Sequence, residues 1–430
     1  MEIIKRPYGT EDVLPANSKS WSVLETFLRS TAEKYGFSEI RVPTFEETSL
    51  FSRGVGETTD VVQKEMYTVL AKESTFTLRP EGTAGTIRAI LENGLLNEPL
   101  PLRVCYILSC FRHERPQKGR LREFHQFGVE MAGSADAMAD AEVISLANQI
   151  LTQLGVKGIS LRINSIGCPA CRAKYHEALK AYFLPHKDRL CETCQDRLER
   201  NPMRLLDCKS EICREIGKDA PLILDYLCED CAAHFEKLKA DLTLLGIDYT
   251  VDPRIVRGLD YYTKTVFEFV TDCIGAQGTV CGGGRYDGLI EQLGGPATPA
   301  LGFGMGLERL LLVLEKQGVT LAEPTGVDLF LIPMGDAASD KALQLVAALR
   351  REGLSSQMDV MGRSMRKQMK YADKLGARFT AVIGDTELAE GKVAVKNMAT
   401  GEKIDLPLDD SFTARFADIE IADRLAKETV

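Results

Sequence analysis

Residues 111–127 read Phe-Arg-His-Glu-Arg-Pro-Gln-Lys-Gly-Arg-Leu-Arg-Glu-Phe-His-Gln-Phe. This polar, basic segment has strand-like sequence on both sides, at residues 104–110 and 124–131. From Arg112 to Arg122 there are five basic residues and one glutamate, so the local charge is +4. A solvated hairpin loop is the general interpretation of such a segment. However, Arg112 directly follows an apolar strand, and the arginine fork suits phosphate recognition.

The sequence around this segment predicts a largely antiparallel sheet. Apolar residues recur at helical spacing over residues 18–35 and 139–154, and a glycine directly follows each stretch, so both are predicted to be helices. Residues 161–166 and 265–270 are typical of further strands. Because few helices are interleaved with these strands, an antiparallel sheet is favoured over a βαβ repeat.

Two segments stand apart from this pattern. Residues 167–248 are helical in pattern, charged and rich in cysteine, which is typical of an insertion between two strand regions. Glu-Pro-Thr-Gly at residues 323–326 predicts a linker. Beyond it, strands and helices alternate between residues 328 and 383, followed by a hairpin and a last helix, which predicts a small α/β domain. The predicted domains are residues 1–325, with the 167–248 insertion, and residues 326–430.

Composition narrows the class of protein. The 430 residues are 44% hydrophobic and 27% charged, which is ordinary for a soluble globular protein. Apolar runs such as residues 310–314 are far shorter than the ~20 residues that cross a bilayer, and residues 1–12 lack the apolar core of a secretory signal. We therefore expect a cytoplasmic protein. The formal net charge of -9 argues against a nucleic-acid partner. However, this value is a sum over the whole chain, whereas nucleic-acid binding depends on the charge of a local surface.

Any nucleotide site must be built without the familiar phosphate loops. No glycine-rich loop ending in Gly-Lys-Ser/Thr and no Gly-x-Gly-x-x-Gly motif is present. Residues 78–83 (Leu-Arg-Pro-Glu-Gly-Thr) form a polar turn that leads into a helix from about Thr83. Glu81 and Thr83 either cap that helix or hold the ammonium group of a small substrate.

Three glycine-containing motifs follow. Residues 256–265 (Val-Arg-Gly-Leu-Asp-Tyr-Tyr-Thr-Lys-Thr) combine Arg257 with two tyrosines, for which packing at a strand entry is the alternative. Residues 281–288 (Cys-Gly-Gly-Gly-Arg-Tyr-Asp-Gly) let backbone approach a ligand closely, although a tight hairpin explains them equally well. Residues 300–310 (Ala-Leu-Gly-Phe-Gly-Met-Gly-Leu-Glu-Arg-Leu) enter a helix through alternating glycines. They place Arg309 among apolar neighbours, where it needs an anionic partner.

Together and in this order, these motifs resemble the histidyl-tRNA synthetases, which belong to the second class of aminoacyl-tRNA synthetases. Residues 111–127 resemble the second motif of that class and residues 302–309 its third. Residues 18–44 resemble its first motif, which lies at the dimer interface. The segments that single out histidine within the class are residues 257–263, 284–288 and 115–120, and the start at residues 6–12 also resembles the family.

The resemblance implies an enzyme that uses ATP to join L-histidine to tRNA(His) through a histidyl-adenylate. It implies an α+β catalytic domain with an antiparallel sheet flanked by helices, and an α/β anticodon-binding domain at residues 326–430. A cytoplasmic homodimer, Mg²⁺ with the ATP and no membrane association are also implied. The implied catalytic residues are Arg112, Arg257 and Arg309.

The resemblance also implies substrate contacts. ATP would be bound by Arg112, Glu114 and Arg309. Glu130 would accept a hydrogen bond from one ring N–H of histidine, and Tyr262 would satisfy the other ring nitrogen. The complete implied histidine site is Glu81, Gly82, Thr83, Arg112, Gln126, Glu130, Arg257, Tyr261, Tyr262 and Tyr286.

The tRNA contacts are predicted in two places. Residues 363–378 hold six basic residues and one aspartate, and those at helical spacing can share a face. A solvated basic helix is the alternative. Gln117 is a candidate contact for an extra 5′ guanosine, which the family is expected to require. The candidates in the α/β domain are Arg363, Arg366, Lys367 and Lys370.

Eight of the twelve cysteines fall between Cys168 and Cys231. Two Cys-x-x-Cys pairs separated by nineteen residues match the spacing of zinc sites, so Cys168, Cys171, Cys191 and Cys194 are candidate ligands of a structural Zn²⁺. With Cys208, Cys213, Cys228 and Cys231, the eight thiols could form two four-cysteine sites. Alternatively they are small core residues of a helical insertion. The family resemblance does not require zinc.

Two other functions compete with the synthetase. One is a catalytically silent synthetase-like regulatory subunit of histidine biosynthesis, and the other is a module that senses uncharged tRNA. Relatives of the first kind usually lack the terminal domain and lose motif residues. Because Arg112, Arg257, Arg309 and the terminal α/β segment are all present, the sequence favours the enzyme.

Overall fold

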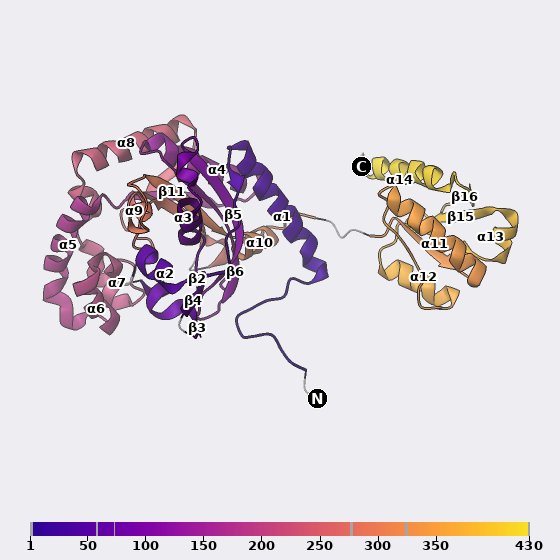
Figure 1. The fold of residues 1–430 in the computed structure, drawn as a ribbon, viewed down its shortest axis with the longest axis horizontal. Coiled ribbons are helices and arrows are strands. Elements are labelled where there is room, and N and C mark those ends of the chain that lie inside the picture. The colour runs from indigo at the N-terminus through magenta and orange to yellow at the C-terminus, as the bar shows by residue number, and fades with distance from the viewer. Residues whose placement is uncertain (1–2, 57–58, 73, 276–277, 323–325, 429–430) are drawn as a thin grey trace. The chain divides into compact units, whose positions relative to one another are not determined.

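A computed structural model describes residues 3–56, 59–72, 74–275, 278–322 and 326–428. The chain divides into two compact units, Met1–Ala322 and Glu323–Val430 (Figure 1). Three of the four residues of the predicted linker, 323–325, lie outside the described residues.

An eight-stranded sheet organises the first unit, in the order β1-β5-β6-β11-β10-β9-β7-β8. Neighbours pair antiparallel except at the two edges, where β1 runs parallel to β5 and β7 parallel to β8. The predicted antiparallel sheet is therefore confirmed. Its strands are β1 (Ser38–Glu39), β5 (Leu102–Phe111), β6 (Glu123–Ala132), β7 (Ile159–Ser165), β8 (Tyr249–Val251), β9 (Thr263–Thr271), β10 (Thr279–Arg285) and β11 (Ala300–Gly306).

One face of this sheet builds the main core. Because successive side chains of a strand point to opposite faces, Phe127 and Val129 of β6 share one face with Leu301 and Phe303 of β11, and all are buried there. The helices packed on that face carry apolar residues at helical spacing. They are α1 (Pro15–Lys34), α4 (Ala137–Gln153), α8 (Glu229–Leu244) and α10 (Leu307–Lys316).

The other face is covered only in part. A small sheet, ordered β2-β4-β3, and three helices lie beside it. These elements are β2 (Phe45–Glu47), β3 (Tyr67–Ala71), β4 (Ser74–Leu78), α2 (Thr48–Val55), α3 (Thr83–Glu92) and α9 (Leu289–Gln292).

The predicted helical insertion is confirmed. It contains α5 (Pro169–Phe183), α6 (Glu192–Arg200) and α7 (Glu211–Ile216), and it returns to the sheet through α8. Figure 1 shows α5, α6 and α7 gathered at one side of the first unit. The insertion also contributes the short 3₁₀ helix η4 (Pro202–Leu205).

The second unit is the predicted α/β domain. Its sheet is ordered β13-β12-β14-β15-β16, with β12 parallel to both β13 and β14 and the last two strands antiparallel. The strands are β12 (Leu329–Pro333), β13 (Ser356–Met358), β14 (Phe379–Ile383), β15 (Lys392–Asn397) and β16 (Lys403–Pro407). The helices are α11 (Asp336–Arg351), α12 (Met365–Lys374), α13 (Asp385–Glu390) and α14 (Phe412–Glu428).

Several elements were not predicted, and for two kinds of them the reason is clear. The glycine-rich residues 281–288 and 300–306 supply the central strands β10 and β11, although glycine is depleted in strands. Neighbouring strands on both sides hold these segments in the sheet. Helix α13 is only six residues long and polar, so it has no apolar periodicity to read.

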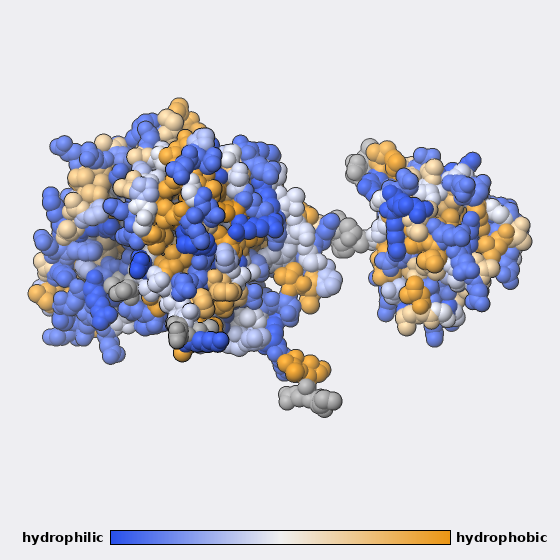
Figure 2. Space-filling view, viewed as in Figure 1, coloured by the Kyte–Doolittle hydropathy of each residue, from blue (hydrophilic) through white to orange (hydrophobic). Residues whose placement is uncertain are grey.

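Hydrophilic residues dominate the visible surface of each unit, with apolar residues scattered among them (Figure 2). Within the described residues, no helix combines the length and the apolar character that crossing a membrane requires.

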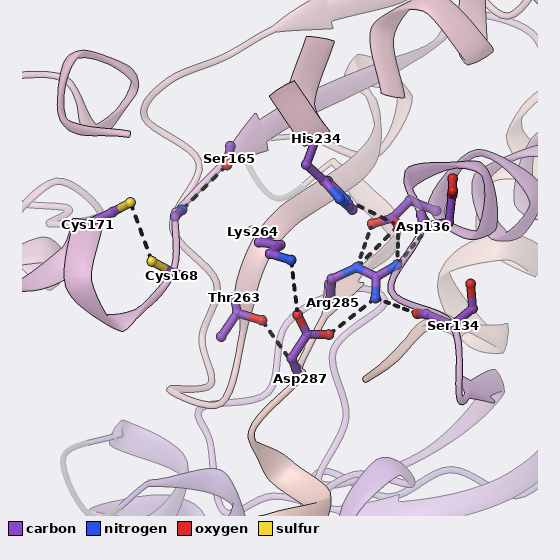
Figure 3. Close-up of polar contacts among 12 residues, drawn as sticks. Ser134, Asp136, Ser165, Cys168, Cys171, His234, Thr263, Lys264, Arg285 and Asp287 are labelled. Carbon is purple, nitrogen blue, oxygen red and sulfur yellow. Dashed lines mark hydrogen bonds and ion pairs between the residues drawn. The ribbon is translucent and has the colours of Figure 1, made fainter. Parts of the chain in front are cut away.

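Arg285, at the end of β10, is fully buried and ties the sheet to α4. It forms an ion pair with Asp140, which is also buried, and a second ion pair with Asp287 at 3.2 Å (Figure 3). It also donates to the carbonyl oxygens of Ser134 and Asp136 at 2.7 and 3.1 Å. Part of the 284–288 motif therefore has a structural role.

Arg285→Ala should destabilise the first unit by about 3–5 kcal/mol, because it removes the arginine that pairs with the buried Asp140 carboxylate and leaves only His234, at 3.4 Å, beside it. Chemical denaturation followed by circular dichroism measures this change. The control is Arg162→Ala, which removes a partly exposed ion pair with Asp252 and should cost about 1 kcal/mol or less. Equal losses in the two variants would contradict the structural role of Arg285.

Candidate functional site

A cavity of about 460 Å³ opens over β6, β10 and β11, on the face opposite the main core. Both the loop after β5 and the segment before β9 contribute to its wall. Nine of the residues predicted to bind substrate line it: Glu81, Thr83, Arg112, Glu114, Gln126, Arg257, Tyr261, Tyr262 and Arg309. The separate sequence motifs thus meet in one place.

Glycines create the room for this cavity. A Cβ atom on Gly304 would lie 1.9 Å from Nε2 of Gln126, and one on Gly302 would lie 2.0 Å from Oε2 of Glu130. On β10, a Cβ on Gly282 would lie 2.6 Å from the guanidinium of Arg257. The alternating glycines of β11 therefore leave space for polar side chains on the cavity face.

Glu130 is a fully buried carboxyl held by two tyrosines. It accepts hydrogen bonds from the hydroxyls of Tyr106, at 2.9 Å, and Tyr286. Burial raises its pKa from 4.5 to about 8, although the hydrogen bonds from Tyr286 and Thr83 act in the opposite direction. Glu130 and Tyr286 share the face of the predicted site but are not among the residues that line the cavity. Tyr106, one apolar-looking residue of β5, was missed by the sequence.

Glu81 caps helix α3. Its carboxylate accepts from the backbone N–H of Thr83 at 2.7 Å and of Ala84 at 2.9 Å, so the predicted capping interaction is confirmed. Burial nevertheless raises the pKa of Glu81. Gly82 belongs to the same turn, and its N–H donates to Oε1 of Gln126 at 3.2 Å.

Arg112 and Arg309 are held in the cavity by neutral acceptors. Arg112 donates from Nε to the carbonyl of Pro80 at 2.8 Å and lies over the ring of Phe124. Arg309 donates to the carbonyls of Gly119 and Thr279 at 3.1 and 2.6 Å. Over the described part of the chain, neither forms an ion pair with a carboxylate. Burial, followed by the charge of Arg120, lowers the pKa of Arg309. Their positive charges are therefore only partly compensated.

Arg257 is different because it has a carboxylate partner. It forms an ion pair with Glu268 of β9 and lies over the ring of Tyr262. Burial alone would lower the pKa of Arg257, but the charge of Glu268 and the interactions with Tyr262 and Tyr261 together outweigh it, and the pKa is raised. Glu268 was missed by the sequence, where its signal was a single charged residue within the apolar run Val-Phe-Glu-Phe-Val.

Two other predicted contacts lie near the cavity. Glu114 lines it and pairs with Arg120 at 2.9 Å. Gln117 lines a neighbouring cavity instead, which shares Gly119, Leu121 and Glu308 with the first. The backbone of Gln117 pairs with that of Arg120.

In the second unit, a groove of about 1030 Å³ lies where β12 and β13 end. Arg363 lines it, pairs with Asp359 and lies over the ring of Tyr371 at 4.4 Å. Arg366, Lys367 and Lys370 follow on α12 and are exposed. The predicted basic residues are thus on or next to one groove.

The eight clustered cysteines form two groups of four. The sulfur atoms within each group lie within 4.8 Å of one another. The two Cys-x-x-Cys pairs that the sequence placed in one candidate set fall into different groups, because each pairs with a later pair of thiols instead. The first group is Cys168, Cys171, Cys228 and Cys231, and the second is Cys191, Cys194, Cys208 and Cys213.

Comparisons with known proteins agree with this geometry. The family described as "Histidyl-tRNA synthetase" matches residues 9–171 and 196–310, and "Anticodon binding domain" matches residues 328–414. The curated histidine–tRNA ligases of Acetivibrio thermocellus and Caldanaerobacter subterraneus are 53% and 54% identical, over 95% of this chain and 98% of each relative. The crystal structure of apo S. aureus histidyl-tRNA synthetase has a TM-score of 0.82 at 42% identity, covering 96% of this chain and 100% of that one.

The raised pKa of Glu130 predicts a pH-dependent effect on stability. Since the folded protein keeps this carboxyl protonated up to about pH 8, the wild type loses stability relative to Glu130→Gln as pH rises from about 4.5 to about 8. Below this window the two proteins should differ least. Above it the difference should stay constant.

The measurement is the thermal midpoint of both proteins between pH 5 and 9. Glu98→Gln, at an exposed position, is the control and should show no such trend. A midpoint difference for Glu130→Gln that does not change with pH would contradict the raised pKa.

Proposed function

The chain belongs to the histidyl-tRNA synthetase family, and from this premise we infer that it joins L-histidine to tRNA(His) in a reaction that uses ATP. Histidyl-adenylate is the intermediate, and AMP and diphosphate are released. The observation that carries this inference is the cavity itself, which brings Arg112, Arg257 and Arg309 together on the face of the sheet that also carries the buried carboxyl of Glu130.

The first step needs positive charge at the reacting phosphate. A carboxylate oxygen of histidine attacks the α-phosphorus of ATP, and the bond to the leaving diphosphate breaks. We propose that Arg112 binds the α-phosphate and the histidine carboxylate, and that Arg309 binds the γ-phosphate. Their incomplete charge compensation supports this, because an incoming polyanion would relieve the repulsion among Arg112, Arg120 and Arg309.

Arg257 is proposed as the third catalytic residue. It would stabilise the negative charge that develops on the phosphate oxygens in the first step. In the second step, it would stabilise the charge on the carbonyl oxygen as the tRNA hydroxyl attacks the carbonyl carbon and AMP leaves. Its ion pair with Glu268 and its contact with the Tyr262 ring support a fixed orientation, which makes such stabilisation effective.

The imidazole of histidine is proposed to bind at Glu130 and Tyr262. Glu130 would accept from one ring N–H, and the Tyr262 hydroxyl would serve the other nitrogen. Such a pocket rejects isosteres that lack either nitrogen, because its own buried polar groups would stay unpaired. Glu81, Thr83, Gln126 and Tyr261 would hold the amino group and close the pocket, and Gly82 and Tyr286 would also belong to the histidine site.

Magnesium would accompany ATP, as the family implies. Carboxylate oxygens suit Mg²⁺, and Glu114 and Glu308 both line the cavity beside Arg309, so the residues present fit the ion. Bound there, it would neutralise phosphate charge. The proposal also includes structural zinc in the cysteine-rich insertion.

The second unit is proposed to read the anticodon of tRNA(His). Its groove lies at the carboxyl ends of the parallel strands β12 and β13. The central strand β12 has β13 on one side and β14 on the other, so the strand order reverses there. In open α/β sheets, ligands bind where the strand order reverses in this way. Arg363, Arg366, Lys367 and Lys370 would contact the tRNA backbone. Gln117 is proposed to contact the 5′ guanosine of the acceptor end.

We also propose that the enzyme is a homodimer, with residues 18–44 at the interface, and that it works in the cytoplasm, where its substrates are found. The regulatory-subunit alternative is not supported. The histidine–tRNA ligases compared above align over 95% of this chain, including the second unit, and all three arginines are present.

The catalytic proposal predicts histidine-dependent exchange of diphosphate into ATP. Arg257→Ala should lower this exchange on the order of 100-fold or more, because charge stabilisation in the transition state is lost. Arg162→Ala, a partly exposed arginine of β7 outside the cavity, is the control and should keep full exchange. Exchange without a preference among amino acids would sink the assignment.

The tRNA proposal predicts a separate effect. The double variant Lys367→Ala, Lys370→Ala should raise the KM for tRNA(His) roughly tenfold at moderate salt, since phosphate contacts are lost. Diphosphate exchange needs no tRNA and should not change. Lys403→Ala, an exposed lysine of β16, is the control. An unchanged KM in the double variant would remove α12 from the tRNA surface.

A further inference from the structure

The two groups of cysteines are nested in the insertion. The root cluster (Cys168, Cys171, Cys228 and Cys231) joins the two ends of the insertion, where the chain leaves β7 and where it enters α8. The inner cluster (Cys191, Cys194, Cys208 and Cys213) lies within the loop that the root cluster closes. A clip that closes a long loop removes much of the freedom of the unfolded chain.

The geometry within each cluster fits a tetrahedral metal. Sulfur atoms bound to zinc at ~2.3 Å lie ~3.8 Å apart. The structure has 3.6 Å between Sγ of Cys168 and Cys171 (Figure 3) and 3.8 Å between Sγ of Cys191 and Cys208. A disulfide needs ~2.05 Å, and all of these cysteines are free. Four sulfur atoms converge in each cluster, which a chance contact between two core thiols does not explain.

The local backbone is arranged to hold sulfur ligands. Cys168, Cys191 and Cys228 each occupy the N-cap of a helix, so the second cysteine of each pair falls in the first turn of α5, α6 and α8. Backbone N–H groups donate to sulfur from Cys228 to Cys171, from Cys191 to Cys213, and from Ser210 to Cys208, at 3.1–3.4 Å. Such hydrogen bonds orient metal-bound thiolates and stabilise their charge.

The short helices of the insertion need an anchor beyond their own core. Helix α6 buries only Cys194 and Leu198, and α7 buries only Cys213 and Ile216. Isolated helices of this length are marginally stable in water. In each of these two helices, half of the buried side chains are cysteines. A metal ion bound by those cysteines would supply the stabilisation that the small core lacks.

The insertion in turn holds the loop that carries Arg257, Tyr261 and Tyr262. Arg204 of η4 is buried, and in the sequence it falls between Cys194 and Cys208 of the inner cluster. Its guanidinium donates to the carbonyls of Arg257 and Gly258 at 3.0 and 2.7 Å. Arg172, which follows Cys171, donates to the carbonyl of Tyr262 at 3.0 Å.

Two further contacts extend the link. Asn201 donates to Oδ1 of Asp260 at 3.1 Å. The neighbours of Cys208 on both sides, Asp207 and Lys209, line the cavity themselves.

We propose that the insertion holds two structural zinc ions, one in each cluster, and that they fix the loop of Arg257, Tyr261 and Tyr262 in its histidine-binding position. The second half of this proposal rests on the proposed function. Arg172 and Arg204 are positioning residues in it, because they act on histidine only through that loop.

Zinc content tests the first half. The untagged full-length protein, purified and desalted, should contain two zinc ions per chain by mass spectrometry. Cys194→Ser and Cys171→Ser should each contain one. Cys273→Ser, at a cysteine outside both clusters, should keep two. Less than one zinc in the wild type overturns the metal sites, whether or not the enzyme is active.

Arg204→Met tests the second half without touching a thiol. Loss of two hydrogen bonds from a buried charge should raise the KM for histidine in diphosphate exchange about tenfold or more. The KM for ATP should change less than about twofold, and the zinc content should remain two.

Arg189→Met, at an exposed arginine of the insertion, is the matched control and should leave both KM values unchanged. A KM for histidine in Arg204→Met within twofold of wild type would overturn the link to the loop. Absence of exchange in the wild type would instead count against the proposed function, and the zinc content would still decide the metal sites.

Discussion

The cavity exists because one face of β10 and β11 carries almost no side chains. In β11 the glycines at 302 and 304 face Glu130 and Gln126 at distances that no Cβ atom could share, while Leu301 and Phe303 fill the core on the opposite face. The period of two in a strand is what allows a single segment to meet both demands. A methyl group on the cavity face would push into the very polar groups that are proposed to hold the substrate.

Around that opening, the arginines differ in how their charge is balanced. Arg257 has Glu268 beside it, so its position does not depend on a substrate. Arg112 and Arg309 are held by backbone carbonyls and share the cavity with Arg120. A triphosphate bound at these two arginines, as proposed, would relieve the repulsion among them, whereas Arg257 would already be in place when negative charge develops. Binding and catalysis can therefore be separated among side chains of the same type.

Much of this could be predicted from the sequence, and the limits have physical reasons. The apolar periodicity of α1, α4 and the strands β5 and β6 predicted the antiparallel sheet correctly. The three arginines of the sequence motifs all line one cavity. The partners of those residues were not visible. Glu268 and Tyr106 are single polar residues within strands of largely apolar sequence, so their sequence context does not mark them as functional. They lie next to Arg257 and Glu130 only because of the register of the sheet. The grouping of the cysteines failed for the same reason, since spacing along a chain does not say which pairs meet.

The acidic residues behind the negative net charge are unevenly distributed along the chain. Residues 385–430 contain eleven acids and six bases, and residues 363–378 contain six bases and one acid. The two segments meet at Arg378, which pairs with Glu420 and Asp423 of the acidic segment and also with Asp328. The acidic tail therefore neutralises one end of the basic stretch. Within residues 363–378 the exposed cations lie on α12, so a protein with a negative net charge can still present a small positive surface to an RNA.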